Sequence, residues 1–232
     1  MNEIKEKKNK ILPIVNIFLL GDSMAGKTSI LNRFIGNPFI ENQIATIGID
    51  NYVKEIELKN RKKIKIQIYD TAGQEQYRSN AFQLLKTKCE GIVLIYSIND
   101  EESFNNLFEY WINELNDFIE LSKYPIYVIG NKCDLKDERL ITYEQGEQAS
   151  SKYKFKFMET SAKTNMNIQE LFTNISQDIY DLSYTITENN EIKKKDVSNS
   201  FPIVNQPRKK SLFMKIFDYI GKKIKNLFKK SK

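Results

Sequence analysis

A glycine-rich loop that ends in lysine and threonine has the residue types for holding phosphate. Its glycines let successive backbone N–H groups face phosphate oxygens, and the start of a following helix adds positive potential. We expect Lys27 to reach the β- and γ-phosphates and the Thr28 hydroxyl to ligate Mg²⁺. Taken alone, the motif also fits an ordinary strand-to-helix turn. The predicted phosphate-binding residues are Gly21, Asp22, Ser23, Met24, Ala25, Gly26, Lys27, Thr28 and Ser29.

A second motif, Asp70-Thr71-Ala72-Gly73-Gln74, follows an alternating apolar run. A carboxylate such as Asp70, at the end of a strand beside a phosphate loop, can hold the coordination shell of Mg²⁺, usually through water. Gly73 permits a close backbone approach to a γ-phosphate, and Gln74 can orient an attacking water without acting as a base. By itself an Asp-x-x-Gly sequence is most often only a turn.

Two further motifs can select a purine. Asp134, in Asn131-Lys132-Cys133-Asp134, can accept hydrogen bonds from both N1–H and the 2-amino group of guanine. Adenine offers no such pair of donors, so this carboxylate would favour guanine. In Ser161-Ala162-Lys163 the Ala162 N–H can donate to guanine O6, and Lys163 can lie along the ring.

Short apolar runs alternate with helical periodicity, which predicts a mostly parallel α/β sheet with helices on both faces. The runs around 49–58 and 64–68, joined by a short polar turn, predict the one antiparallel pair. Each of the four motifs falls at the carboxyl end of a predicted strand, where open α/β sheets bind ligands. The other predicted strands are 14–20, 92–98, 124–129 and 155–159, and predicted helices follow Thr28 and span about 101–120, 143–153 and 167–182.

The set GDSMAGKT, TIGID, DTAGQE, NKCD and ETSAK resembles the Ras superfamily, and within it the Rab family of vesicle-traffic GTPases. The resemblance covers about residues 13–182 and implies a P-loop NTPase fold with six strands that binds GTP or GDP with Mg²⁺ and hydrolyses GTP slowly. Lys27 and Gln74 would then be the catalytic residues. The implied Mg²⁺ ligands are Thr28, Thr46 and Asp70, and the implied nucleotide contacts beyond the phosphate loop are Phe39, Thr46, Gly73, Asn131, Lys132, Asp134, Ser161, Ala162 and Lys163.

The resemblance also implies two switch segments, at about 37–50 and 73–85, that bind effectors, an exchange factor and a GTPase-activating protein. Three features depart from the Rab pattern. Asn51 stands where Rabs usually have Phe, Tyr69 stands where they usually have Trp, and the stretch 76–85 differs and is one residue longer. These sites form the effector surface in Rabs, so nucleotide chemistry is retained while effector identity differs. A signalling or scaffold GTPase of another superfamily branch, or a GTP-binding scaffold without hydrolysis, is the alternative; Gln74 argues against the latter.

Composition limits the remaining function classes. The chain has 232 residues and no histidine, which excludes His-based triads and His metal sites. Cys89 and Cys133 suit a reducing compartment as unpaired thiols. No apolar run reaches the roughly 18 residues of a membrane span. We expect a polar arm at 1–12, a GTPase domain at 13–183, a flexible linker at 184–210 and a basic amphipathic helix at 211–232.

The predicted C-terminal helix carries most of the basic charge. Residues 208–232 hold ten Lys or Arg and one acid, Asp218, so they sum to +9 and leave −3 for the other 207 residues of a chain at +6. No cysteine follows Cys133, so prenylation there is not expected. A helix with apolar residues on one face and lysines on the rest favours an anionic membrane surface.

The alternatives for this segment are a partner-binding helix, a nucleic-acid patch, a solvated tail, or a membrane-remodelling activity of its own. We expect a cytoplasmic monomer, associated peripherally with the cytosolic face of an intracellular membrane, with no nucleic-acid partner. The apolar positions of the predicted helix are Leu212, Phe213, Ile216, Phe217, Ile220, Ile224, Leu227 and Phe228.

Overall fold

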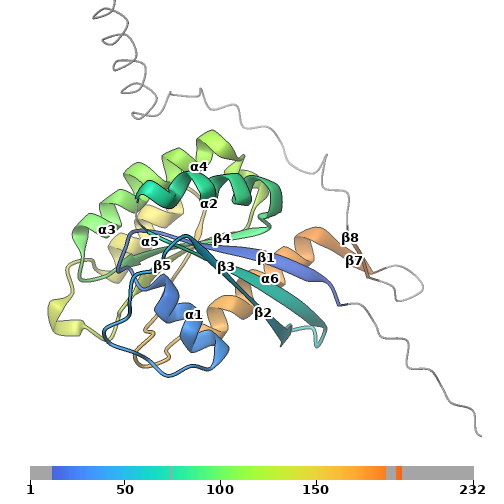
Figure 1. Ribbon diagram of the computed structural model, residues 1–232, viewed down its shortest axis with the longest axis horizontal. Helices are drawn as coiled ribbons and strands as arrows, with labels where there is room; N and C mark the ends of the chain where they lie inside the picture. Colours follow the sequence, from blue (N-terminus) through green and yellow to red (C-terminus); the bar gives the residue numbers. More distant parts are fainter. Residues whose placement is uncertain (1–11, 74, 187–191, 195–232) are drawn as a thin grey trace, which may run out of the picture.

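The computed structural model describes residues 12–73, 75–186 and 192–194, with the side chains of 75–80, 185–186 and 192–194 excepted. One sheet has the strand order β2-β3-β1-β4-β5-β6 (Figure 1). β2 pairs antiparallel with β3, and the other neighbours are parallel, which confirms the predicted six-stranded, mostly parallel sheet. The strands are β1 (Ile14–Leu20), β2 (Ile49–Glu57), β3 (Lys63–Thr71), β4 (Gly91–Ser97), β5 (Ile126–Asn131) and β6 (Lys156–Glu159).

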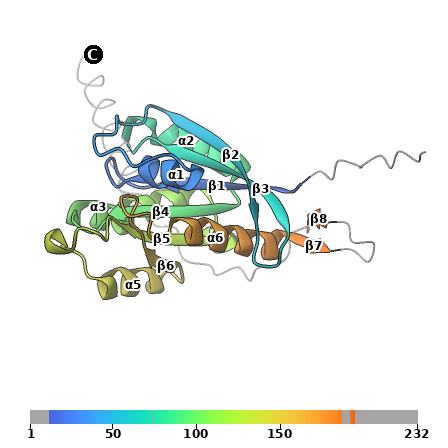
Figure 2. The ribbon, with the colours of Figure 1, turned by 90° about the horizontal axis from the view of Figure 1, so that it is seen from below.

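Helices cover both faces of the sheet and enclose two separate apolar cores (Figure 2). Successive residues of β1 alternate between the two cores, with Ile17 and Leu19 in one and Phe18 and Leu20 in the other. This alternation is the reason why a strand buried on both faces reads as a continuous apolar run. α1 (Lys27–Ile35) and α6 (Ile168–Ser183) cover the first core, and α2 (Glu75–Lys88), α3 (Glu101–Asn106), α4 (Ile112–Phe118) and α5 (Tyr143–Lys152) cover the second.

The helix predicted over 101–120 is not a regular α-helix. α3 passes into a π-helical turn, η1 (Leu107–Trp111), in which the Ile112 N–H donates to the Leu107 carbonyl, and α4 then ends at Phe118. Asp100 begins this helix by accepting from the Glu102 and Ser103 N–H groups at 3.1 and 3.3 Å. The single-turn 3₁₀ segments η2 (Leu121–Lys123) and η3 (Lys136–Glu138) lie in the connections on either side of β5.

The segment predicted to be a linker begins with regular structure. β7 (Tyr184–Ile186) and β8 (Ile192–Lys194) form a short antiparallel hairpin directly after α6. The Tyr184 hydroxyl donates to the Ile14 carbonyl at 3.1 Å, and its ring stacks on Tyr180 at 5.3 Å. The hairpin is thereby fixed beside the start of β1, at the amino ends of the parallel strands.

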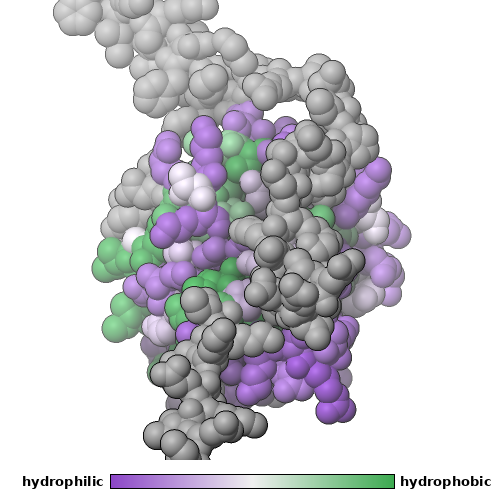
Figure 3. All heavy atoms as spheres, turned by 90° about the vertical axis from the view of Figure 1, so that its right-hand side faces the viewer, coloured by the Kyte–Doolittle hydropathy of each residue, from purple (hydrophilic) through white to green (hydrophobic). Residues whose placement is uncertain are grey.

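Figure 3 looks at this end of the molecule and shows mainly hydrophilic side chains on the described surface that is visible. Within the described ranges, no helix has the length and apolar character needed to cross a membrane. The predicted helix at 211–232 lies outside the described residues, as do 195–210 of the predicted linker and all but Leu12 of the predicted arm at 1–12.

Candidate functional site

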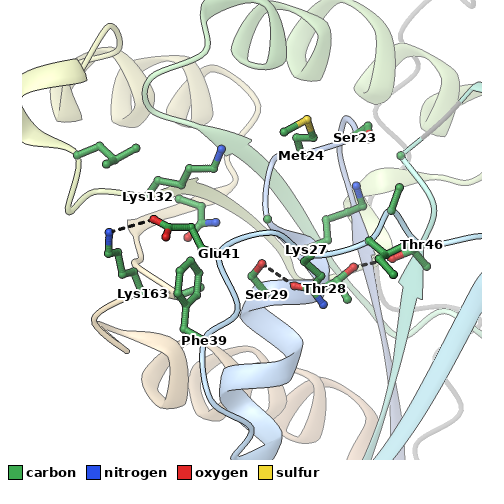
Figure 4. A pocket seen from close by; sticks show the side chains of 18 of the residues that line it. Ser23, Met24, Lys27, Thr28, Ser29, Phe39, Glu41, Thr46, Lys132 and Lys163 are labelled. Carbon is green, nitrogen blue, oxygen red and sulfur yellow. Dashed lines mark hydrogen bonds and ion pairs between the residues drawn. The ribbon is translucent and has the colours of Figure 1, made fainter.

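A cavity of about 420 Å³ opens at the carboxyl ends of the parallel strands (Figure 4). Its volume falls in the range of small-molecule sites. Most of the residues selected from the sequence meet there, although they come from six separate segments of the chain. The predicted residues that line it are Ser23, Met24, Gly26, Lys27, Thr28, Ser29, Phe39, Thr46, Gly73, Asn131, Lys132, Asp134, Ala162 and Lys163.

The loop between β1 and α1 is curled by residues with a positive φ. Gly21 and Gly26 have φ values of 136° and 98°, and Met24 between them has 63°. A Cβ on Gly21 would lie 2.1 Å from the Ile95 carbonyl oxygen, so only glycine fits between this loop and β4. The glycines of the motif therefore serve close packing as well as loop curvature.

Lys27 is already directed into the loop that it terminates. It is 5% exposed, and its Nζ donates to the carbonyl oxygens of Gly21 and Asp22 at 2.8 and 2.7 Å. Figure 4 shows its ammonium group pointing into the cavity beside Ser23. The loop thus holds a buried positive charge where an anion would be bound.

Three side-chain oxygens converge at the start of α1. The Thr28 hydroxyl donates to Asp70 Oδ2 at 2.6 Å and lies 2.7 Å from the Thr46 hydroxyl, which is itself 3.3 Å from the same Oδ2. Asp70 is fully buried, and its Oδ1 has no hydrogen-bond partner among the described residues. Burial raises the pKa of Asp70, and the hydrogen bond from Thr28 opposes that rise.

This cluster of hard oxygens, with a buried carboxylate oxygen left unpaired, suits a divalent cation such as Mg²⁺. The predicted ligand set of Thr28, Thr46 and Asp70 is therefore brought together. The described residues contain no group of three or more acidic or cysteine side chains placed to hold a metal. A cation here would need further ligands from water or from a bound phosphate, as is usual for Mg²⁺.

Gly73 lies against the phosphate loop. A Cβ at this position would be 2.3 Å from the Ser23 backbone nitrogen, 2.5 Å from the Asp22 carbonyl carbon and 2.7 Å from Lys27 Nζ. The main chain after β3 therefore passes directly over the loop, which only a residue without a side chain allows. Gln74, the predicted water-orienting residue, lies outside the described residues.

Two loops after β5 and β6 form the other end of the cavity and are bonded to each other and to the phosphate loop. The Asn131 amide donates to the Ala25 carbonyl at 2.9 Å and accepts from the Thr160 hydroxyl at 3.1 Å. The Ser161 hydroxyl donates to Asp134 Oδ1 at 2.5 Å. Asn131 thus fixes the base end of the cavity against the phosphate end, and Ser161 orients the carboxylate of Asp134.

Phe39 and two lysines frame this end. Phe39 packs partly buried against the core and faces the cavity near Lys163 (Figure 4). Lys163 lies 3.7 Å from Glu41, but both side chains are more than half exposed, so this ion pair contributes little. Burial lowers the pKa of Lys132. An apolar ring and two lysine side chains therefore border the site that Asp134 faces.

Among the described residues, five that were predicted for the site do not line the cavity. Gly21, Asp22, Ala25 and Asp70 lie behind the lining residues, and Ser161 reaches the site through Asp134. Conversely, sequence reasoning did not select six lining residues. Their only signal in the sequence was their position in the first switch segment, in the Asp70–Gln74 motif, or directly after Asp134: Glu41, Gln43, Ile44, Ala45, Thr71 and Leu135.

A partly buried ion pair next to the loops after β5 and β6 was also missed. Arg139 donates twice to the Glu159 carboxylate, at 2.6 and 2.9 Å, and once to the Ile141 carbonyl. Glu159 closes β6 just before the Thr160-Ser161 segment, and its backbone carbonyl accepts from Asn167 at 2.8 Å. This bidentate pair joins the segment after Asp134 to the end of β6. It therefore positions both the loop after β5 and the loop after β6.

Comparisons with known proteins agree with this geometry. The model of the Ras family matches residues 16–181. The chain is 41% identical to Ras-related protein Rab-8B of Bos taurus over 166 residues, which are 72% of this chain and 78% of the relative. It is 40% identical to Ras-related protein Rab-8A of Mus musculus, again over 72% of this chain and 78% of the relative. It is 39% identical to GTP-binding protein ypt2 of Schizosaccharomyces pombe, over 72% of this chain and 81% of the relative.

Proposed function

The chain belongs to the Ras family of small GTPases, which bind GTP and GDP and hydrolyse GTP, and from this premise we propose that the cavity is the nucleotide site of a Rab-type switch. The observation that carries the proposal is the position of Asn131, whose amide bonds to the Ala25 carbonyl. Through it the loop of residues 21–28 and the loop of residues 131–134 form the two ends of one cavity.

At the phosphate end, the backbone between Gly21 and Gly26 and the buried ammonium of Lys27 hold the β- and γ-phosphates. At the base end, Asp134 accepts from N1–H and the 2-amino group of guanine, while Ser161 keeps its carboxylate in place. Phe39, Ala162 and Lys163 contact the purine. Because adenine lacks both donors, the site selects GTP over ATP.

Thr28, Thr46 and Asp70 are the residues that would hold Mg²⁺, with Asp70 acting through water. When bound, the ion would neutralise charge on the β- and γ-phosphate oxygens. Gln74 orients the attacking water and Lys27 stabilises the charge that develops. The water oxygen bonds to the γ-phosphorus as the bond from that phosphorus to the leaving oxygen of GDP breaks, which releases GDP and inorganic phosphate. Unaided family members turn over at about 10⁻⁴ s⁻¹, and an activating partner supplies most of the rate.

The nucleotide state is transmitted through two segments. With GTP bound, Thr46 of the first switch and Gly73 of the second are held beside the γ-phosphate, and hydrolysis releases both. In the first switch Ile40, Ile44 and Ile47 are 57%, 89% and 77% exposed, which provides apolar surface for an effector.

Removing magnesium tests the proposed ligands. We expect EDTA to raise the dissociation rate of labelled GDP about tenfold, because the phosphates lose the largest positive charge near them. In Thr28→Val, dissociation should already be fast in Mg²⁺, and EDTA should add less than about twofold because a metal ligand is gone. Stopped-flow fluorescence with a labelled GDP measures both rates.

Thr173→Val on α6 is the matched control. Its hydroxyl bonds to the Gln169 carbonyl far from the cavity, so its EDTA response should equal that of the wild type. If EDTA leaves the wild-type rate unchanged, the assignment of the metal ligands is wrong. If the wild type retains no guanine nucleotide at all, the nucleotide site itself is wrong.

We place the switch in vesicle traffic, by its likeness to the Rab-8 and ypt2 proteins. Of Asn51 and Tyr69, which depart from the Rab pattern, only Asn51 lies on the surface, so the expectation that Tyr69 forms part of an effector surface is wrong. Asn51 is exposed on β2 and accepts from Gln67 at 3.3 Å. Tyr69 is only 3% exposed and stacks on Phe18 at 4.5 Å. The polar Asn51 side chain therefore stands where an effector would meet an apolar residue, and its effectors differ from those of Rabs with Phe there.

The proposed anchor is the basic amphipathic segment 211–232, which would bind the anionic cytosolic face of an intracellular membrane. We expect full-length protein to sediment with phosphatidylserine liposomes, and the change of Phe213, Phe217 and Phe228 to Ser to weaken binding at least about tenfold, because three buried rings are lost. Phe201→Ser, in the linker, is the control and should bind normally. Undiminished binding by the triple variant would refute the anchor.

A further inference from the structure

Asp22 lies in the loop between β1 and α1 but does not line the cavity. Its side chain is hydrogen-bonded to the helix that α3 and η1 form. Asn106 Nδ2 donates to its Oδ2 at 2.7 Å, and Trp111 Nε1 donates to its Oδ1 at 2.8 Å. Trp111 is 1% exposed. Hydrogen bonds to a carboxylate are roughly twice as strong as neutral ones, so both donors hold Asp22 firmly.

The π-helical turn explains how both donors reach one carboxylate. In a regular α-helix successive residues are turned by about 100°, so residues five apart point about 140° away from each other. η1 is a π-helical turn, and the bond from Ile112 N–H to the Leu107 carbonyl is an i→i+5 bond. That turn brings Asn106 and Trp111 onto the same face. Short π-helical turns inside α-helices occur frequently at functional sites.

The Trp111 ring also contacts α2, the helix of the second switch segment. The ring packs edge to face against Phe82 of α2, with centroids 6.1 Å apart. Phe82 also stacks on Phe118 of α4 at 5.0 Å. Figure 1 shows α2 lying alongside α4 above the sheet. One indole therefore touches both the phosphate loop and α2.

The backbone directly before α2 also lies against Asp22. Gly73 lies so near the Asp22–Ser23 peptide that a Cβ on it would be 2.5 Å from the Asp22 carbonyl carbon. The Asp22 carbonyl in turn accepts from Lys27 Nζ at 2.7 Å. Asp22 is thus contacted by Gly73 on its main chain and by Trp111 on its side chain. Gly73 is part of the second switch segment, and Trp111 contacts that segment through Phe82.

We propose that Trp111 and Asn106 are positioning residues for nucleotide retention: through Asp22 they hold the phosphate loop in its binding curvature and couple that curvature to the position of α2. Neither residue lines the cavity, so both act through Asp22. The proposal rests on the nucleotide site proposed above and adds to it a control of nucleotide release from outside the site.

The test is the dissociation rate of labelled GDP from full-length protein in Mg²⁺. Trp111→Phe keeps an aromatic ring beside Phe82 but removes the N–H donor and part of the buried ring volume, so the Asp22→Ala background below is needed to isolate the effect of the hydrogen bond. We expect it to accelerate dissociation about tenfold, the usual effect of losing one hydrogen bond to a charged group. Asn106→Ala, at a half-buried position that leaves the core intact, should accelerate dissociation to a similar degree. In an Asp22→Ala background, Trp111→Phe should cause no further acceleration.

Phe118→Leu is the matched control, because it disturbs the same packing around Phe82 without touching Asp22. It should lower Tm and leave dissociation within about twofold of the wild type. The proposal is overturned if both Trp111→Phe and Asn106→Ala retain GDP as the wild type does, or if Trp111→Phe acts equally with and without Asp22. A wild type that binds no labelled GDP would instead refute the nucleotide site.

Discussion

Changing Asp134 to asparagine is expected to weaken GTP binding about a thousandfold, because two hydrogen bonds to a charged acceptor, each contributing about 1.5–3 kcal/mol, are lost or mismatched. The amide has one acceptor and one donor where guanine presents two donors. Xanthine carries a carbonyl at C2 in place of the 2-amino group, so the same variant should bind xanthosine triphosphate more tightly than the wild type does. Competition against a labelled nucleotide measures both affinities.

Asp137→Asn is the control for this change. Asp137 is an exposed acid in η3, three residues after Asp134. The control makes the same chemical substitution and should leave the affinity for GTP within about twofold, as expected of an exposed position. Equal binding of GTP by wild type and Asp134→Asn would show that Asp134 does not read the base. Equal binding of ATP and GTP by the wild type would carry the same conclusion.

Gly73→Ala is expected to slow single-turnover GTP hydrolysis at least about a hundredfold while GDP affinity changes less than about fivefold. The added Cβ would meet the Ser23 nitrogen at 2.3 Å, and that atom belongs to a backbone that cannot move aside. The main chain before α2 must therefore withdraw from the phosphate loop. Only GTP requires the close approach, since GDP lacks the phosphate beside which Gly73 is proposed to lie.

The control for Gly73→Ala is Gly36→Ala at the end of α1. No atom lies within 4 Å of the added Cβ there, but φ is +101°, so the substitution is strained. It should lower Tm and leave the hydrolysis rate unchanged. This pair separates a loss of stability from a loss of function. Release of phosphate by Gly73→Ala within threefold of the wild-type rate would contradict the proposed role of Gly73.

The sheet was predictable because strands that are buried on one or both faces have recognisable patterns of apolar residues. β4 is buried throughout, β1 is buried over most of its length and both are nearly continuously apolar, while β3 alternates before its end. The phosphate loop and the Asn131–Asp134 motif stand at the ends of such strands. Parallel strands bring their carboxyl ends to one edge, so their meeting in one cavity followed from the topology.

The features that escaped prediction depend on contacts between distant segments. The π turn at 107–111 shifts one hydrogen bond within an otherwise helical run and brings Trp111 to Asp22, 89 positions away in the sequence. The hairpin after Ser183 has strands of three residues each, too short to show alternation. Among the side chains of α2 that the structure describes, Ala81, Phe82 and Leu85 are buried, and three such positions are too few to predict a helix from periodicity.

The bond from Tyr184 to the Ile14 carbonyl has a consequence for orientation. It holds the end of the folded domain at the edge of the sheet opposite the cavity. A protein tethered through residues beyond Lys194 would present its nucleotide and both switch segments on the side facing away from the tether. An exchange factor or effector arriving from the cytosol could then engage the domain without displacing the anchor.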